Sequence, residues 1–396
     1  MRRILLSAVF VLAACGNSSE GGGAPAVDAG GDVSDGPSTP LTLDAFMTEE
    51  LELAKIPGMS VAIVKKGKVV FTGAWGYADL EAKTKVTPDT IFLVASVSKT
   101  VTAVAAMQLV EQGKLDLDAD VNGYLPFTVR NWRFPDDKIT MRMLLSHSAS
   151  IQEDYIGLFT LIAPGDSKTE LRAFVESFVV PGGSLYNRAQ WGEAKPGTKY
   201  AYSQVGTSVA ALVVEQLAGK PFDAYSKETI IEKLAMRDTS WRLAEVDVAR
   251  VAYPYTYIAS KGYVRNEHWG APFFPAATIH TTAGELGKFL GSMSEHDGTL
   301  ISAATETEML RVQYPANDPD EGLLWQHRKI GGFDTVGHGG GAPGVSTTMY
   351  FRETDGVGVI TLTNSDVHIR VSLTREEEND AYVEIEKRLF AEADKY

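Results

Sequence analysis

The stretch that most constrains the fold is residues 95–112, which read ASVSKTVTAVAAMQLVEQ. Polar side chains interrupt this run at only a few positions, and Gly113 follows it directly. A helix that is apolar on nearly all sides has to be buried, and glycine is a common residue just past a helix end. The sequence therefore predicts a central helix that the rest of the chain encloses.

Two polar residues near the start of this helix can carry chemistry. Ser96 and Lys99 stand three residues apart, in the only Ser-x-x-Lys of the chain, and side chains at i and i+3 share one helix face. A serine hydroxyl is a poor nucleophile until a base takes its proton, and a desolvated lysine can serve as that base. The helix N-terminus adds partial positive charge beside the serine. We therefore predict Ser96 as nucleophile and Lys99 as base, the Ser/Lys variant of serine catalysis.

The composition favours a small-molecule or peptide substrate. Lysine and arginine number 37 against 51 acidic residues, giving a net charge of −14 without a basic stripe, which disfavours nucleic acid as a partner. The seven histidines show no metal-ligand spacing. The glycines of GGGAPG at 339–344 precede a strand-like run and enclose a proline, so they do not form a dinucleotide loop. We expect no metal and no cofactor.

The N-terminus has the pattern of an export signal. Two arginines precede an apolar stretch from Ile4 to Leu12, which is too short to span a bilayer. The only cysteine, Cys15, follows Leu-Ala-Ala and resembles the lipobox of bacterial lipoproteins; the alternative is an ordinary signal with a stray cysteine. We predict a lipoprotein signal peptide at 1–14, lipidation of Cys15, a flexible linker at 15–40, and a protein anchored to a membrane of the cell envelope, facing the periplasm or the exterior.

Beyond the linker, strand signals and helix signals occupy different regions. Apolar runs on either side of Lys66-Gly67 predict an antiparallel hairpin, whereas helical segments separated by Pro and Gly dominate from residue 115. We therefore predict an α+β protein, in which residues 41–114 and 265–396 form an antiparallel sheet flanked by helices and residues 115–264 form a mostly helical inserted domain. Besides 95–112, the expected helices are 41–53, 141–146, 169–179, 204–218, 222–234, 283–293, 303–312 and 376–393. The later strand-like runs are 323–330, 346–352 and 357–363.

Three short elements, in order along the chain, carry a resemblance to a known family: SVSK at 96–99, YSQ at 202–204 and HGGG at 338–341. A secondary signature is ITMRMLLSHSAS at 139–150. Over residues 42–395 the chain resembles the serine hydrolases that include class C β-lactamases, D-alanyl-D-alanine peptidases of the penicillin-binding type and related esterases. The resemblance implies a β-lactamase/transpeptidase-like fold.

The resemblance also implies roles for the second element. The family's tyrosine shares the proton transfer with the serine and lysine, which implies Tyr202 as the third catalytic residue. Tyrosine can act as a base only if nearby cations lower its pKa, and Lys99 is the expected neighbour. Gln204 stands where the family usually has an asparagine that contacts the substrate, so its amide reaches one methylene further.

The third element implies the remaining substrate contacts. His338 stands where class C β-lactamases carry lysine, and its ordinary pKa of about 6.5 leads us to expect a charge that changes near neutrality. Gly339, Gly340 and Gly341 leave the strand edge open to a substrate. The backbone N–H groups of Ser96 and Gly341 are the implied oxyanion hole. His147, within SHSAS, is implied to be structural and hydrogen-bonded to the backbone.

These observations predict an exported serine hydrolase that forms an acyl-enzyme on Ser96. The substrate is a D-amino-acid peptide amide, a β-lactam or a small ester, and the sequence does not choose among them. The alternative is a catalytically silent relative that binds cell-wall peptides or assists another envelope protein. Retention of the serine, lysine, tyrosine and glycine strand together disfavours it, because a silent binder has no need of the lysine.

Overall fold

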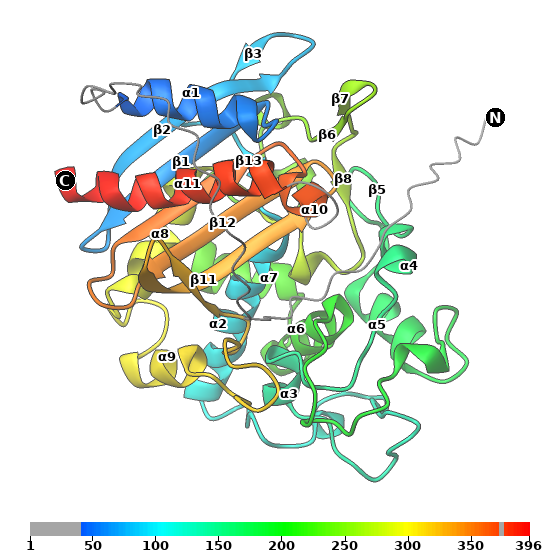
Figure 1. Ribbon diagram of the computed structural model, residues 1–396. Helices are drawn as coiled ribbons and strands as arrows, with labels where there is room; N and C mark the ends of the chain where they lie inside the picture. The colour runs from blue at the N-terminus through cyan, green and yellow to red at the C-terminus, as the bar shows by residue number, and fades with distance from the viewer. Residues whose placement is uncertain (1–40, 372–375) are drawn as a thin grey trace, which may run out of the picture.

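The computed structural model describes residues 41–371 and 376–396. The predicted signal peptide, the lipidation at Cys15 and the linker fall on residues 1–40 and lie outside the described residues. The described chain is an α+β protein built on a seven-stranded antiparallel sheet, which confirms the predicted fold class (Figure 1). The strand order is β10-β11-β12-β13-β1-β2-β3.

The sheet joins strands from the two ends of the sequence. Its members are β1 (Gly58–Lys65), β2 (Lys68–Asp79), β3 (Thr84–Lys85), β10 (Gln326–Ile330), β11 (Phe333–Ala342), β12 (Val345–Arg352) and β13 (Gly358–Thr363). β1 pairs with β2 as the predicted hairpin, and on its other side with β13, Met59 opposite Thr363. The predicted sheet of N- and C-terminal segments therefore forms through the β1–β13 pair.

Each face of the sheet is covered by helices. Met59, Val61 and Ile63 of β1 pack under α1 (Leu43–Leu53) and α11 (Glu376–Glu392), whereas Ala62 and Val64 belong to the core on the opposite face, which α8 (Ala283–Ser294) covers (Figure 1). Successive side chains of a strand point to opposite faces, so a strand that is apolar at every position is buried on both sides.

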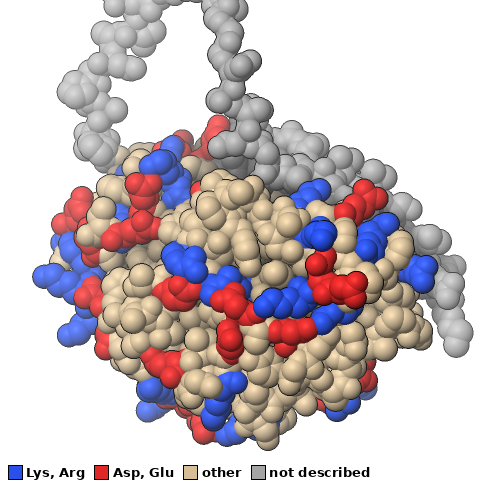
Figure 2. Space-filling view, turned by 90° about the horizontal axis from the view of Figure 1, so that it is seen from below, with Lys and Arg blue, Asp and Glu red and all other residues tan. Residues whose placement is uncertain are grey.

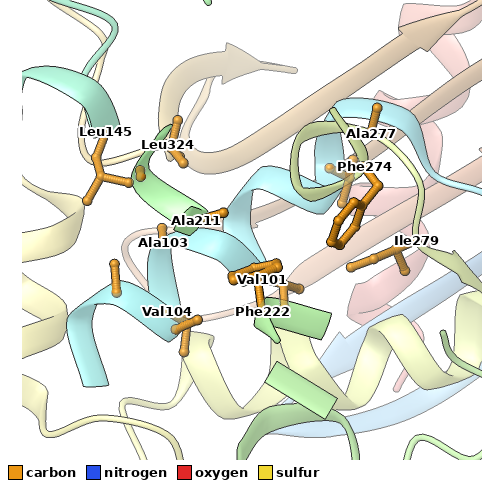
Figure 3. Close-up of a cluster of buried hydrophobic side chains, with 14 of the residues drawn as sticks. Val101, Ala103, Val104, Leu145, Ala211, Phe222, Phe274, Ala277, Ile279 and Leu324 are labelled. Carbon is orange, nitrogen blue, oxygen red and sulfur yellow. The ribbon is translucent and has the colours of Figure 1, made fainter. Parts of the chain in front are cut away.

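Helix α2 (Ser98–Glu111) is the buried helix expected from the sequence. Every residue from Ser98 to Leu109 is buried, and α2 packs against α6 (Gln204–Ala218), α7 (Phe222–Ser226) and α9 (Ala303–Leu310). Figure 3 shows Val101, Ala103 and Val104 of α2 in one apolar cluster with Ala211 and Phe222 of the neighbouring helices. Because α2 lies at the centre of this core, a group at its N-terminus is held in place from several sides.

The remaining α-helices and strands are short. They are α3 (Met141–Leu145), α4 (Tyr155–Phe159), α5 (Leu171–Val179), α10 (Val367–Val371), and the two-stranded pairs β4–β9 (Phe92–Leu93 and His280–Thr281), β5–β8 (Ala163–Pro164 and Trp269–Gly270) and β6–β7 (Tyr255–Ile258 and Gly262–Arg265). The β6–β7 hairpin lies at the end of the region that was predicted to be mostly helical, residues 115–264.

The predicted helix 222–234 is interrupted. α7 ends at Ser226 and continues as one π-helical turn, Lys227–Ile231. Hydroxyl groups bind the helix's own carbonyls here: Ser226 Oγ donates to Phe222 O at 2.9 Å and Thr229 Oγ1 donates to Tyr225 O at 2.9 Å. Such bonds compete with the regular helical ladder, so the predicted continuous helix is wrong at this point.

Charged side chains of both signs lie among uncharged residues on the face shown in Figure 2. On the face shown in Figure 2, Lys and Arg side chains lie interspersed with Asp and Glu. Across residues 41–371 and 376–396, the chain forms no helix with the length and hydropathy needed to cross a membrane.

Candidate active site

Ser96 lies in a 3₁₀ turn, Ala95–Val97, immediately before α2. Ala95 takes a positive φ of 46°, a strained conformation for a side chain other than glycine's that persists only where the surroundings impose it. The sheet supplies part of that restraint, since Thr347 Oγ1 of β12 donates to Val94 O at 2.8 Å. The nucleophile is thus held at the junction of the sheet and the central helix.

Lys99 is fully buried and reaches three acceptors. Its Nζ donates to Ser96 Oγ at 3.1 Å, to Gln204 Oε1 at 2.6 Å and to the carbonyl of Ala276 at 2.9 Å. Burial lowers the pKa of Lys99 to about 7, although the nearby carboxylates of Glu153 and Glu321 act in the opposite direction. A large fraction of Lys99 is therefore a neutral amine near neutral pH, as a base for Ser96 requires.

Tyr202 lies on the other side of the serine. Its side chain is hydrogen-bonded to Ser96, and Lys99 Nζ lies 4.8 Å from the centre of its ring. Burial raises the pKa of Tyr202 well above its ordinary value, and the carboxylates of Glu321 and Glu153 add to the rise. The expectation that Lys99 lowers the pKa of this tyrosine is therefore wrong. Tyr202 is a neutral phenol that can donate or relay a proton.

The glycine strand passes directly over the serine turn. A Cβ added to Gly340 would lie 2.5 Å from Val94 O and 3.2 Å from Ser96 N, so only glycine permits this approach. Gly341 is exposed, and Gly339 is half-buried. In the described residues, β10 pairs with β11 only as far as Gly337. No strand among the described residues therefore pairs with this edge of β11 beyond Gly337, where the strand passes next to Ser96.

His338 is buried on the same strand, between Gly337 and Gly339 in sequence. Its Nδ1 is hydrogen-bonded to the carbonyl of Gly339, and its ring centre lies 6.3 Å from that of Tyr202. Burial, followed by the charge of Lys99, lowers the pKa of His338 to about 3. The expected change of charge near neutrality is therefore wrong, because burial keeps this imidazole neutral there.

His147 has the structural position that was expected. The Ser203 N–H donates to His147 Nδ1 at 3.1 Å, and the imidazole packs against Tyr202 with ring centres 4.3 Å apart. Burial holds the pKa of His147 well below its ordinary value. A neutral His147 therefore supports the turn that carries Tyr202.

Three groups of the site were not found from the sequence: the Ala276 carbonyl, Glu153 and Glu321. A backbone carbonyl has no sequence signature. The two glutamates are 7% and 3% exposed, but each stands in a polar stretch, QED and DEG, that reads as a surface loop. The structure does bring together all the predicted residues, Ser96, Lys99, Tyr202, Gln204, His338 and the glycines 339–341, within one site.

The fold and this arrangement of side chains define the chain as a protein of the serine-hydrolase type with the β-lactamase and penicillin-binding fold. Residues 43–381 match the family model described as Beta-lactamase. The chain belongs to this family.

Individual relatives are distant. Protein flp of Staphylococcus aureus (strain MRSA252) is 26% identical over 246 residues, covering 62% of this chain and 46% of the relative. The chain thus matches about half the length of such curated relatives.

Solved structures are similar over most of the chain. The octameric penicillin-binding protein homologue from Pyrococcus abyssi superposes with a TM-score of 0.66 at 26% identity, covering 82% of this chain and 73% of that one. The D-amino acid amidase from Ochrobactrum anthropi SV3 gives a TM-score of 0.68 at 20% identity, covering 88% and 100%. At this identity the likeness to the amidase shows a shared fold.

Proposed function

We propose that the chain is an exported serine hydrolase that cleaves an ester or amide through an acyl-enzyme on Ser96. The observation that carries the proposal is the buried Lys99 Nζ, 3.1 Å from Ser96 Oγ, whose pKa of about 7 lets it accept the serine proton. The alternative, a catalytically silent binding protein, does not explain this lysine. Burying an amine costs free energy, and binding alone does not require the amine.

The mechanism follows from the contacts. Ser96 Oγ attacks the carbonyl carbon of the substrate while its proton passes to the neutral Lys99 amine. The backbone N–H groups of Ser96 and Gly341 stabilise the negative charge that develops on the carbonyl oxygen. Tyr202, hydrogen-bonded to Ser96, passes its proton to the leaving group and takes the proton that Lys99 received from Ser96, so that both groups are neutral again. Water then attacks the acyl carbon and gives a proton to Lys99, which returns it to Ser96 Oγ as the bond between Ser96 and the acyl group breaks.

The site supports small amide or ester substrates better than β-lactams. His338, neutral near pH 7, offers no cation to a substrate carboxylate, in contrast to the lysine of class C β-lactamases. The amide of Gln204 is held by Lys99 through its oxygen, which leaves its nitrogen to bind a substrate carbonyl. The shared fold with a D-amino acid amidase is consistent with an amide of a D-amino acid.

Active-site labelling tests the proposal. A fluorophosphonate should form one covalent adduct, which peptide mass spectrometry should place on Ser96, and Ser96→Ala should abolish it. Ser98→Ala is the matched control, because Ser98 begins helix α2 two residues after Ser96 but accepts a bond from the Ile279 N–H at 3.1 Å instead of contacting Lys99. A wild-type protein that gives no adduct, or an adduct on another serine, would contradict the proposal.

The pH dependence gives a second test. Activity requires neutral Lys99, so kcat/KM for an uncharged ester should rise with pH through about 7 and then remain level. No loss is expected near pH 10, because the pKa of Tyr202 is raised. His338→Gln should leave the position of the rise unchanged, since this imidazole is neutral throughout that range. A rise centred near the ordinary lysine pKa would show that burial does not lower the pKa of Lys99, and a profile without any rise between pH 5 and 11 would show that Lys99 is not the base.

The proposal places the protein at the cell envelope, supported by the signal pattern and by the position of Cys15. Cys15→Ser should yield protein without lipid that is released from membranes, whereas the wild type should label with a radioactive or alkynyl fatty acid. Equal membrane partition of both proteins would mean that Cys15 is not the anchor.

A further inference from the structure

Glu153 is a buried carboxylate that joins a distant loop to the start of helix α6. Its oxygens accept three hydrogen bonds: from Ser203 Oγ at 2.8 Å, from Gln204 N at 2.5 Å and from Val205 N at 2.8 Å. Ser203 Oγ in turn accepts from the Gly206 N–H at 2.8 Å as the N-cap of α6. Two helix N–H groups that would otherwise lack partners are thus bound by a residue some 50 positions earlier.

The turn that Glu153 holds also carries the groups that contact the catalytic pair. Gln204 donates its N–H to Glu153 and accepts from Lys99 Nζ through its side chain at 2.6 Å. Tyr202, just before the turn, is hydrogen-bonded to Ser96. A shift of Glu153 would therefore move both Gln204, which contacts Lys99, and Tyr202, which contacts Ser96.

Glu153 also acts on Lys99 by its charge. The titratable groups facing Lys99 are Glu153, Glu321 before β10, Tyr202, His147 after α3 and His338 on β11. Tyr202 and the two histidines are uncharged near neutrality. The two glutamates are thus the groups of this set that can favour the ammonium form of Lys99. Burial raises the pKa of Glu153 to about 7, whereas its three hydrogen bonds and the charge of Lys99 favour the carboxylate. Burial also raises the pKa of Glu321 well above its ordinary value.

The two glutamates differ in how they are held. Glu321 accepts from Gln326 Nε2 at 3.1 Å and from the Tyr200 hydroxyl at 3.5 Å, groups that do not contact Ser96 or Lys99 in any described bond. Glu153 alone of the pair is bonded to Gln204, which touches Lys99. Glu153 therefore affects Lys99 in two ways: it holds Gln204, which contacts the lysine amine, and its charge raises the pKa of that amine.

We propose that Glu153 is a positioning residue for acyl transfer: its carboxylate fixes the turn that carries Tyr202 and Gln204, and its negative charge sets the pH at which Lys99 can accept the Ser96 proton. The inference rests on the proposed function, since it assigns Lys99 as the base. An amide cannot replace the carboxylate here, because two backbone N–H groups point at its oxygens and an –NH₂ group would oppose one of them.

The test uses Glu153→Gln in the full chain, with Glu285→Gln as the matched control. Glu285 is also a buried carboxylate that accepts from a backbone N–H, that of Asp238 at 2.8 Å, and from a hydroxyl, Thr239 Oγ1 at 2.7 Å. It does not contact Lys99. The rate of Ser96 labelling by a fluorophosphonate is measured against pH for the wild type and both variants.

Removing the charge of Glu153 favours the neutral amine, so the rise of the Glu153→Gln profile should move to lower pH by up to about one unit. Its plateau rate should fall by about 10–100-fold, because the turn is displaced. Glu285→Gln should keep the wild-type rise. A lower plateau with an unmoved rise would mean that Glu153 is merely structural, and would overturn the proposal.

Should Glu153→Gln fail to fold, a second pair of variants, Glu153→Asp and Glu285→Asp, tests the proposal. Glu153→Asp keeps the charge but is too short to hold all three donors, so its plateau should fall several-fold more than that of Glu285→Asp. Equal plateaus of these two variants would overturn the proposal. If wild-type Ser96 is not labelled at all, the proposed function fails and this inference fails with it; if the wild type is labelled and the Glu153 variants behave like the controls, only this inference fails.

Discussion

Replacing Lys99 by methionine should slow the acylation of Ser96 by about 10²–10⁴-fold, the usual contribution of a general base. Methionine fills a similar volume without the amine, so Ser96 Oγ loses the acceptor for its proton, 3.1 Å away. The apolar substitution also removes the cost of burying an amine, so the variant should fold. The measurement is the second-order rate constant for labelling of Ser96 by a fluorophosphonate, with folding checked by thermal unfolding.

A control on the same helix separates loss of the base from damage to the core. Thr102 is buried in α2 and donates to the carbonyl of Pro275 at 2.8 Å, next to Ala276, which accepts from Lys99. Thr102→Val removes a comparable buried hydrogen bond but leaves the amine, so its labelling rate should stay within about threefold of wild type. Equal rates for Lys99→Met and Thr102→Val would show that Lys99 does not take the serine proton.

The parts of the site that are local in sequence could be predicted. Ser96 and Lys99 lie three residues apart at the start of an apolar helix, and the turn that precedes α2 keeps their side chains in contact. The N-caps of the predicted helices 283–293 and 303–312 are equally local: Thr282 Oγ1 accepts from Glu285 N at 3.2 Å, and Ser302 Oγ accepts from Thr305 N at 3.4 Å. Such features depend on residues within one helical turn.

The charge state of the site could not be predicted in the same way. The ordinary pKa of histidine suggested that His338 titrates near neutrality. The expected neighbour Lys99 suggested that the pKa of Tyr202 is lowered. Both groups are buried by segments far away in the chain, and burial disfavours each charged form. The placement of His338, Tyr202 and Gln204 came from the family resemblance, whereas their protonation depends on packing that no short motif encodes.

The burial of Glu153 also could not be predicted from the sequence. Its neighbours in sequence, Gln152 and Asp154, are exposed, as expected for a polar loop. Yet Glu153 points inward and binds the N-terminus of α6, where the unsatisfied N–H groups compensate for burying a carboxylate. A partner about 50 residues away provides that compensation, so composition alone gives no sign of it.

The second large effect is expected at Gly340, where alanine should abolish labelling of Ser96. The added Cβ would lie 2.4 Å from Thr347 Oγ1 and 2.5 Å from Val94 O, closer than atoms can approach. Strand β11 and the serine turn must then separate, which moves Gly341 N–H and Ser96 N–H apart and dismantles the oxyanion hole. Loss of one such donor costs about 10²–10³-fold in rate, and overpacking should also lower the free energy of unfolding by about 1–3 kcal/mol.

The matched control is Gly284→Ala in helix α8. There the nearest atom to an added Cβ is Thr72 Cγ2 at 3.7 Å, an ordinary contact, and alanine is favoured over glycine in a helix by about 0.5–1 kcal/mol. This variant should unfold at the wild-type temperature or slightly above it, and should be labelled at the wild-type rate. If Gly340→Ala is also labelled normally, the close approach of β11 to Ser96 is not required, and the N–H group of Gly341 does not stabilise the oxyanion.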